Sequence, residues 1–168
     1  KGIDTAPLRA LIGQYVDESK IRQSAVRFGL IATRFPSMQR AEKRLTDMEE
    51  GSLCDWLMAS SACFPVFPMA RIGEERYMDG GFCDNVPVDM AILDGAKRII
   101  ALDIGRNQSH TRYEKRPNVT YIRTTHPLGG LLTFDPEVSR RNEVIGYNDV
   151  MRAFGCMRGT RYAFDPVD

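Results

Sequence analysis

The chain has 168 residues, the usual size of one compact domain, and is 43% hydrophobic and 27% charged, which excludes disordered, collagen-like and coiled-coil proteins. Its 23 basic and 22 acidic residues give a net charge of +1 and are interspersed, so no nucleic-acid partner is indicated. The longest apolar runs have the length of strands, well short of the about 20 residues that cross a bilayer. The chain begins with Lys1 rather than Met, so we expect it to be part of a larger protein.

The cysteines and histidines do not follow the spacing of a metal site. There is no CxxC pair, and the two histidines are isolated in the sequence. We therefore expect no structural metal and no disulfide framework, but free thiols in a reducing compartment. The four cysteines are Cys54, Cys63, Cys83 and Cys156.

The first half of the chain alternates helical and extended patterns. Apolar residues at helical spacing predict an amphipathic helix over residues 5–16. The apolar run 26–33 predicts a strand covered on both faces, which Pro36 ends. Residues 52–55 have the form of a capping box, so a helix should start there and run to about residue 62.

The second half supplies the patterns of an α/β fold. A short hairpin around Gly73 leads to Asp79, and Pro87 and Gly95 mark the start and end of a short helix. Residues 98–104 and 119–122 predict strands. The strand that ends at Asp79, the short helix and the strand 98–104 therefore follow one another as a βαβ unit. A last helix is predicted over residues 136–154.

Asp79 is the first candidate for a functional residue. It follows a short strand and precedes a helix, and sites in open α/β sheets lie at the carboxyl ends of strands. Gly80 and Gly81 lack Cβ atoms, so the backbone can adopt unusual dihedral angles and a substrate or a neighbouring loop can approach closely. A tight turn with a capping aspartate has the same residues and is the alternative interpretation.

Other titratable residues offer weaker candidates. Asp84, Asp89 and Asp94 continue the series from Asp79 at intervals of five, which could indicate a carboxylate metal site. Five residues turn a helix through about 500°, so we interpret them as solvated charges pointing in different directions. Asp103 ends a buried-type strand, and either faces the site or bonds nearby backbone amides.

The histidines and the nucleotide-binding motifs give no further site. We interpret His110 and His126 as loop or surface residues. The sequence has neither a G-x-G-x-x-G after a strand nor a P-loop, so no cofactor is expected.

Residues 57–105 closely resemble the second half of patatin-like phospholipases. The resemblance rests on the strings LMASSACFPVFP, YMDGGFCDNVPV and AILDGAKRIIALDIG, and the segments 4–17 and 28–33 are also similar. It implies a three-layer α/β/α fold with a mostly parallel central sheet, here lacking its N-terminal strands. Residues 1–168 would form the C-terminal part of a single patatin-like phospholipase domain.

The resemblance also implies the chemistry. In this family the aspartate of an Asp-Gly-Gly motif completes a Ser–Asp dyad that hydrolyses fatty acyl esters, and Asp79 occupies that position. Gly80, Gly81, Asn85 and Pro87 match the residues that support the motif. No serine of the chain has glycine at both minus two and plus two, so the nucleophile and the oxyanion loop are expected upstream of Lys1.

Partners and location follow from the same resemblance. The substrate would be a phospholipid or another acyl-ester lipid, and the protein would be cytoplasmic with transient, interfacial contact at membranes. A sheet that lacks strands exposes an edge, so we expect association with the N-terminal half of the domain or with another chain. A non-catalytic lipid-binding or scaffold protein is the alternative function.

Overall fold

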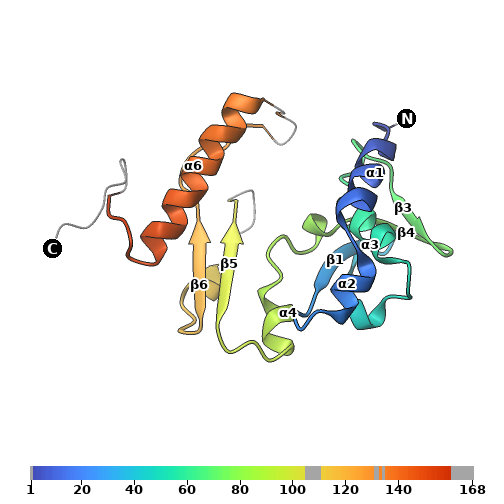
Figure 1. Cartoon of the computed structure of the whole chain (residues 1–168), viewed down its shortest axis with the longest axis horizontal. Helices are drawn as coiled ribbons and strands as arrows, with labels where there is room; N and C mark the ends of the chain where they lie inside the picture. The colour runs from blue at the N-terminus through green and yellow to red at the C-terminus, as the bar shows by residue number, and fades with distance from the viewer. Residues whose placement is uncertain (1, 105–110, 131–132, 134, 160–168) are drawn as a thin grey trace. The chain divides into compact units, whose positions relative to one another are not determined.

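The computed structural model describes residues 2–104, 111–130, 133 and 135–159. The helices of more than one turn in these residues are α1 (Ala6–Tyr15), α2 (Glu18–Gln23), α3 (Leu53–Ser60), α4 (Val88–Leu93) and α6 (Pro136–Ala153), shown in Figure 1. The strands are β1 (Gly29–Phe35), β2 (Gln39–Arg44), β3 (Ala70–Ile72), β4 (Glu75–Asp79), β5 (Ile99–Asp103) and β6 (Val119–Arg123). Three short helices, η1 (Leu45–Asp47), η2 (Gly80–Phe82) and α5 (Thr111–Glu114), complete the described elements.

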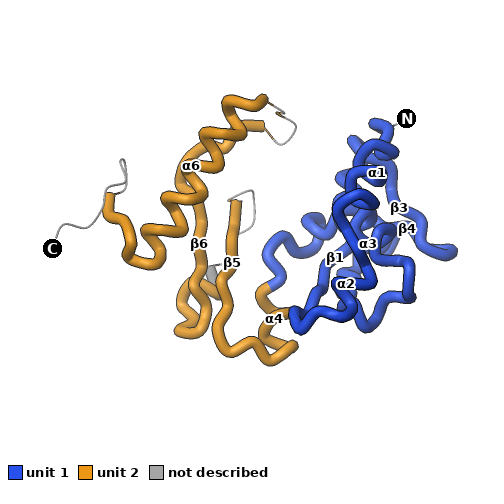
Figure 2. The backbone as a smooth tube through the Cα atoms, viewed as in Figure 1, with its two compact units in different colours: residues 1–87 blue, residues 88–168 orange. Residues whose placement is uncertain are grey.

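The chain is α/β and divides into two compact units, residues 1–87 and 88–168 (Figure 2). The first unit contains a four-stranded sheet in the order β2-β1-β4-β3, in which every neighbouring pair is antiparallel. The second contains a two-stranded parallel sheet of β5 and β6. The mostly parallel central sheet that we expected is therefore not formed by the described residues.

Short connections explain two of the antiparallel pairs in this sheet. β1 and β2 are joined by residues 36–38, and β3 and β4 by Gly73 and Glu74, whereas a parallel pair needs a crossover of a dozen or more residues. The predicted hairpin is confirmed, with φ of +62° at Gly73. The predicted βαβ unit is wrong at its first strand: β1 and β3 occupy both edges of β4, so β4 is not available to pair with β5.

The strand β1 is covered on both faces, as its apolar run predicts. Four consecutive residues, Leu30 to Thr33, are buried. The strand begins later than expected, because Val26 is 75% exposed and lies outside it. β2 was not predicted: its sequence QRAEKR has the charged composition of an edge strand and no apolar alternation.

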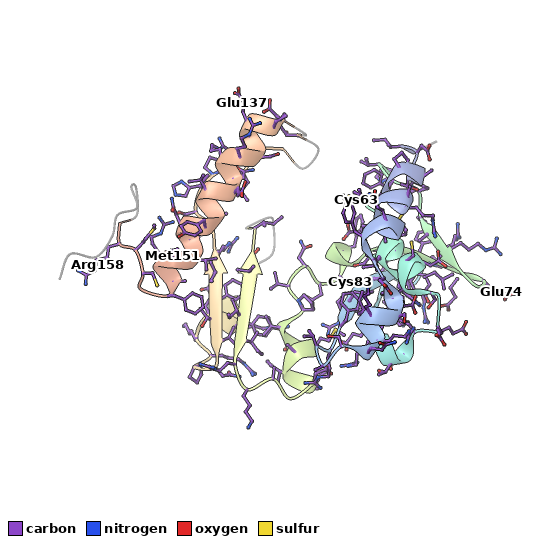
Figure 3. The ribbon with its side chains drawn as sticks, viewed as in Figure 1. Cys63, Glu74, Cys83, Glu137, Met151 and Arg158 are labelled. Atoms are coloured by element: carbon purple, nitrogen blue, oxygen red, sulfur yellow. The ribbon has the colours of Figure 1, made fainter. Side chains whose placement is uncertain are left out.

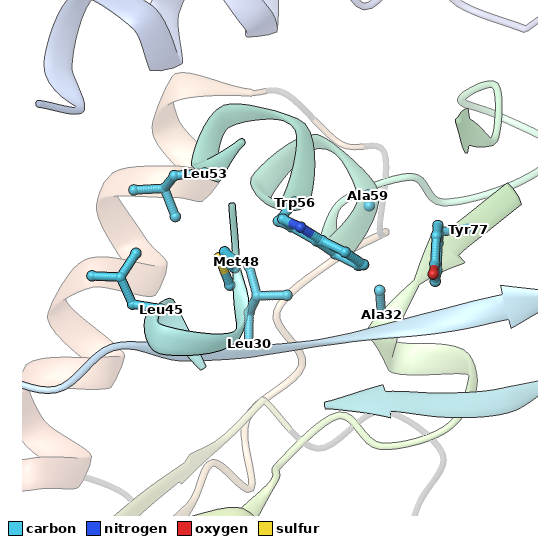
Figure 4. Close-up of a cluster of buried hydrophobic side chains, with 8 residues drawn as sticks. All are labelled: Leu30, Ala32, Leu45, Met48, Leu53, Trp56, Ala59 and Tyr77. Atoms are coloured by element: carbon cyan, nitrogen blue, oxygen red, sulfur yellow. The ribbon is translucent and has the colours of Figure 1, made fainter. Parts of the chain in front are cut away.

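The hydrophobic core of the first unit lies between α3 and the sheet (Figure 4). Trp56 of α3 is 5% exposed, and its ring meets the ring of Tyr77 from β4 edge-on, with centroids 5.0 Å apart. The Lys43 ammonium lies 4.7 Å from the centroid of the Trp56 ring. The core residues are Leu30, Ala32, Leu45, Met48, Leu53, Trp56, Ala59 and Tyr77. This packing fixes α3 against the strands that carry the candidate site.

The N-terminus of α3 differs from the predicted capping box. The Ser52 side chain donates to the Glu49 carbonyl oxygen at 2.6 Å and does not cap the helix. Glu18 of α2 does so instead: its carboxylate accepts from the backbone N–H groups of Gly51 at 3.0 Å and Leu53 at 3.1 Å. The cap comes from a residue distant in sequence, which a local motif cannot reveal.

The second unit confirms four predicted elements. β5 and β6 lie at the expected positions, and α6 begins after Asp135, whose side chain accepts from the N–H groups of Glu137 at 2.8 Å and Val138 at 3.1 Å. Figure 3 labels Glu137 in the first turn of α6. The short helix predicted from Pro87 is α4, and Gly95 follows it with φ of +79°. None of the described helices is long and apolar enough to cross a membrane.

Candidate active site

Asp79 is the last residue of β4 and is held by the backbone on both sides. Its N–H donates to the Ala62 carbonyl oxygen at 2.9 Å, and its own carbonyl oxygen accepts from the Thr33 hydroxyl at 2.8 Å. Thr33 lies in β1 and is fully buried. The Asp79 carboxylate oxygen Oδ1 accepts from the Gly81 N–H at 2.6 Å. One carboxylate oxygen is thus fixed by the turn, and the half-buried side chain is held in one orientation.

Gly80 and Gly81 are required by space. A Cβ atom on Gly80 would lie 2.3 Å from the Ile31 carbonyl oxygen, which is backbone and cannot move aside. A Cβ atom on Gly81 would lie 2.3 Å from Asn85 Oδ1 and 3.0 Å from Asp79 Oδ1. Neither glycine has a positive φ, so the close approach of neighbouring groups, and not an unusual backbone conformation, explains both.

A cavity of about 310 Å³ lies beside this turn, within the first unit. All the site residues named from the sequence line it: Asp79, Gly80, Gly81, Asn85 and Pro87. The remaining lining residues are Leu30, Ile31, Ser60 and Asp84. Its volume falls in the range of small-molecule sites, and its lining combines apolar strand residues with the carboxylates of Asp79 and Asp84.

The interpretation of Asp84 as a solvated charge is wrong. Only 8% of the residue is exposed, and its carboxylate oxygen Oδ2 accepts from Arg40 Nη1 of β2 at 2.8 Å. Asp89 is ion-paired as well, with Arg112 at 2.7 Å. The partner of Asp84 lies 44 positions earlier in the chain, so no local spacing indicates the pair.

Two further side chains beside the site were not predicted. Ser60 lines the cavity, but its hydroxyl donates to the Ile31 carbonyl oxygen at 2.8 Å. Cys83, labelled in Figure 3, has its Sγ atom 3.2 Å from both Thr33 Oγ1 and the Met38 carbonyl oxygen. The Ser60 contact joins the end of α3 to β1, and the Cys83 contacts join the turn to β1 and to the segment that follows it.

Asp103 lies in the second unit and pairs with side chains. Its carboxylate accepts from the Tyr121 hydroxyl at 2.7 Å and lies 3.7 Å from Arg123 Nε. Burial and this hydrogen bond raise the pKa of Tyr121. Both contacts are made with side chains of the neighbouring strand β6.

The two histidines considered from the sequence are His110 and His126. The His126 N–H donates to the Thr124 hydroxyl at 3.1 Å in a loop, and His110 lies outside the described residues. Within the described part of the chain, no three histidine, cysteine or carboxylate side chains cluster as a metal site would require.

Comparison with known protein families shows which family the chain belongs to. The family model for patatin-like phospholipases matches residues 2–92, which include β1, α3, β4 and the whole Asp79 turn. The chain belongs to the patatin-like phospholipase family. A search of curated proteins finds no match. The resemblance to this family is therefore confirmed, and because patatin-like proteins are generally lipid acyl hydrolases, the family suggests lipid hydrolysis.

Proposed function

We propose that the intact protein is a lipid acyl hydrolase in which Asp79 is the aspartate of a Ser–Asp dyad. The observation that supports this most is the orientation of Asp79: Oδ1 accepts from the Gly81 N–H at 2.6 Å, and the residue lines the cavity of about 310 Å³. The serine and the oxyanion loop lie upstream of Lys1 in this proposal. Residues 1–168 are then the C-terminal part of one patatin-like domain, whose upstream strands would complete a mostly parallel sheet.

In the proposed reaction Asp79 acts on the serine hydroxyl through Oδ2. A free aspartate has a pKa of about 3.9 and is a weak base, so its contribution comes from orientation and from stabilising charge in the transition state. The serine oxygen attacks the ester carbonyl carbon while its proton passes to Asp79 and then to the leaving alcohol. Water, activated by the same carboxylate, then hydrolyses the acyl-enzyme and releases the fatty acid.

The proposed substrate is a phospholipid or another acyl-ester lipid. Such substrates lie in aggregates, so the protein would make transient, interfacial contact with membranes, and we propose that it is cytoplasmic. Association with the N-terminal half of the domain, or with another chain, would supply the residues of the dyad that the described cavity does not contain.

The substitution Asp79→Asn in the intact protein tests the proposal. Asparagine keeps an oxygen for the Gly81 N–H but cannot act as a base, so turnover of short-chain p-nitrophenyl esters should fall by about 10²-fold to 10⁴-fold with an unchanged circular dichroism spectrum.

Asp135→Asn is the matched control, because asparagine caps a helix as well as aspartate does and Asp135 caps α6. Turnover should be unchanged in this variant. Wild-type turnover in Asp79→Asn would refute the dyad role. A protein that retains lipid binding but shows no turnover even in the wild type would favour the non-catalytic alternative.

A further inference from the structure

The loop that follows Asp79, residues 80–87, is tied to the sheet by an ion pair from β2. Arg40 Nη1 donates to Asp84 Oδ2 at 2.8 Å, and the two side chains are 27% and 8% exposed. Arg40 also bonds the Glu42 carboxylate through Nη2, so one guanidinium holds two carboxylates. β2 is the edge strand next to β1, and the pair therefore links this edge to the loop beside the cavity.

Asp84 joins the backbone at both ends of the loop. Its N–H donates to the Gly80 carbonyl oxygen at 2.8 Å, and its Oδ1 accepts from the Val86 N–H at 3.2 Å. Asn85 lies between these two contacts, with Oδ1 close against Gly81, and Pro87 follows. Asp84 thus contacts both ends of the loop, through its backbone N–H at Gly80 and through Oδ1 at Val86, while its Oδ2 accepts from Arg40.

We propose that Arg40 and Asp84 are positioning residues for the hydrolase reaction. The ion pair fixes the loop that carries Asn85 and Pro87 and so sets the cavity wall beside the Asp79 carboxylate; this inference rests on the proposed function. A buried ion pair adds little net stability compared with apolar residues of the same volume, but it restricts geometry strongly when each oxygen has a defined partner. A displacement of about 1 Å in such a wall is enough to lower a rate by about 10²-fold.

Hydrogen exchange tests the structural half of the inference without any substrate. In ¹⁵N-labelled intact protein, Arg40→Met should make the Val86 amide exchange at least about tenfold faster, because Asp84 loses the partner that holds its carboxylate. Arg40→Lys keeps a donor for Asp84 Oδ2 and should retain most of the protection. Arg9→Met is the matched control: its ion pair with Asp55, at 2.7 Å, joins α1 to α3 and not β2 to the loop.

Kinetics test the functional half with p-nitrophenyl esters. Arg40→Met and Asp84→Asn should lower kcat by about tenfold to 10²-fold with KM changed less than about twofold, since orientation is lost and not binding. Arg40→Lys should recover most of kcat, and Arg9→Met should match the wild type. Asp84→Asn keeps the oxygen that accepts from Val86, so it separates loss of the ion pair from loss of the loop.

The outcomes distinguish this inference from the proposed function. Unchanged Val86 exchange in Arg40→Met overturns the inference whether or not the protein is an enzyme. Altered exchange with unchanged kcat, or an equal fall of kcat in Arg9→Met, overturns the positioning role while the hydrolase function stands. A wild-type protein without esterase activity refutes the proposed function and with it the catalytic role of the ion pair, and the exchange result then still decides whether the pair holds the loop.

Discussion

Gly80 carries the least adaptable steric constraint beside Asp79, because its missing side chain leaves room for backbone atoms of β1. A Cβ atom added to this residue would lie 2.3 Å from the Ile31 carbonyl oxygen. Ile31 lies in the buried, central part of β1, so the strand cannot shift without moving the core. The Asp79 turn can therefore lie this close to β1 only because residue 80 has no side chain.

We expect Gly80→Ala to destabilise the protein by about 3 kcal/mol or more, the upper range for overpacking against a rigid neighbour. Urea unfolding of the 168-residue chain, followed by the fluorescence of Trp56, its single tryptophan, measures this. Gly13→Ala is the control, because Gly13 lies in α1 with no atom within 4 Å of its added Cβ. That change should stabilise by about 0.5–1 kcal/mol. Equal unfolding midpoints for the two variants would contradict the steric explanation.

At the scale of elements, α3 depends on a cap from α2. Two backbone N–H groups at its N-terminus and the Arg22 side chain all donate to the Glu18 carboxylate. Burial alone would raise the pKa of Glu18, but the hydrogen bonds from Arg22, Gly51 and Leu53 lower it more, so its pKa lies below the ordinary value. The helix that carries Trp56 is thereby tied to a neighbouring helix.

This shift predicts a pH-dependent contribution to stability. Because the pKa of Glu18 is lower in the folded state than the about 4.3 of an unfolded glutamate, its contribution is complete above that value and is lost as the pH falls through the folded pKa. Glu18→Gln should cost about 1 kcal/mol at pH 7 and nearly nothing below the folded pKa, as measured by urea unfolding at several pH values.

Glu50→Gln serves as a control for that measurement. Glu50 is exposed in the segment that precedes α3, so this substitution should change stability by less than about 0.5 kcal/mol. A Glu18→Gln deficit that stays constant from neutral to acidic pH would show that packing, and not the charged cap, is responsible.

At the scale of the whole molecule, the proposed dyad is divided between this chain and residues upstream of it. The cavity contains one serine, Ser60, and its hydroxyl donates to the Ile31 carbonyl oxygen at 2.8 Å. Ser60 also lacks the flanking glycines of a nucleophile elbow. These two facts argue against Ser60 as the nucleophile.

The 168-residue chain on its own should therefore hydrolyse p-nitrophenyl esters no faster than its Asp79→Asn variant. The measurement compares both purified chains with the intact protein under the same conditions. Turnover by the isolated wild-type chain that Ser60→Ala abolishes would identify Ser60 as the nucleophile and refute the division of the dyad.

Local patterns were sufficient where neighbouring residues determine the structure. The Gly73 hairpin, the α4 helix ended by Gly95, the buried run in β1 and the turn at Asp79 all depend on dihedral preferences or apolar runs within a few residues. The motif around Asp79 was also sufficient for the family, and its residues Asp79, Gly80, Gly81, Asn85 and Pro87 lie together at the cavity.

Contacts between distant segments required the tertiary structure. The Glu18 cap of α3, the pairing of β1 with β4 and the ion pair of Arg40 with Asp84 join residues that are far apart in sequence and carry no pattern of their own. The sequence by itself determined the family, the Asp79 turn and most of the elements, because these depend on short-range preferences and a contiguous motif. Only the tertiary structure decided the antiparallel sheet of the first unit and the burial of Asp84, because a strand's partners and a carboxylate's counter-ion depend on which segments the folded chain brings together.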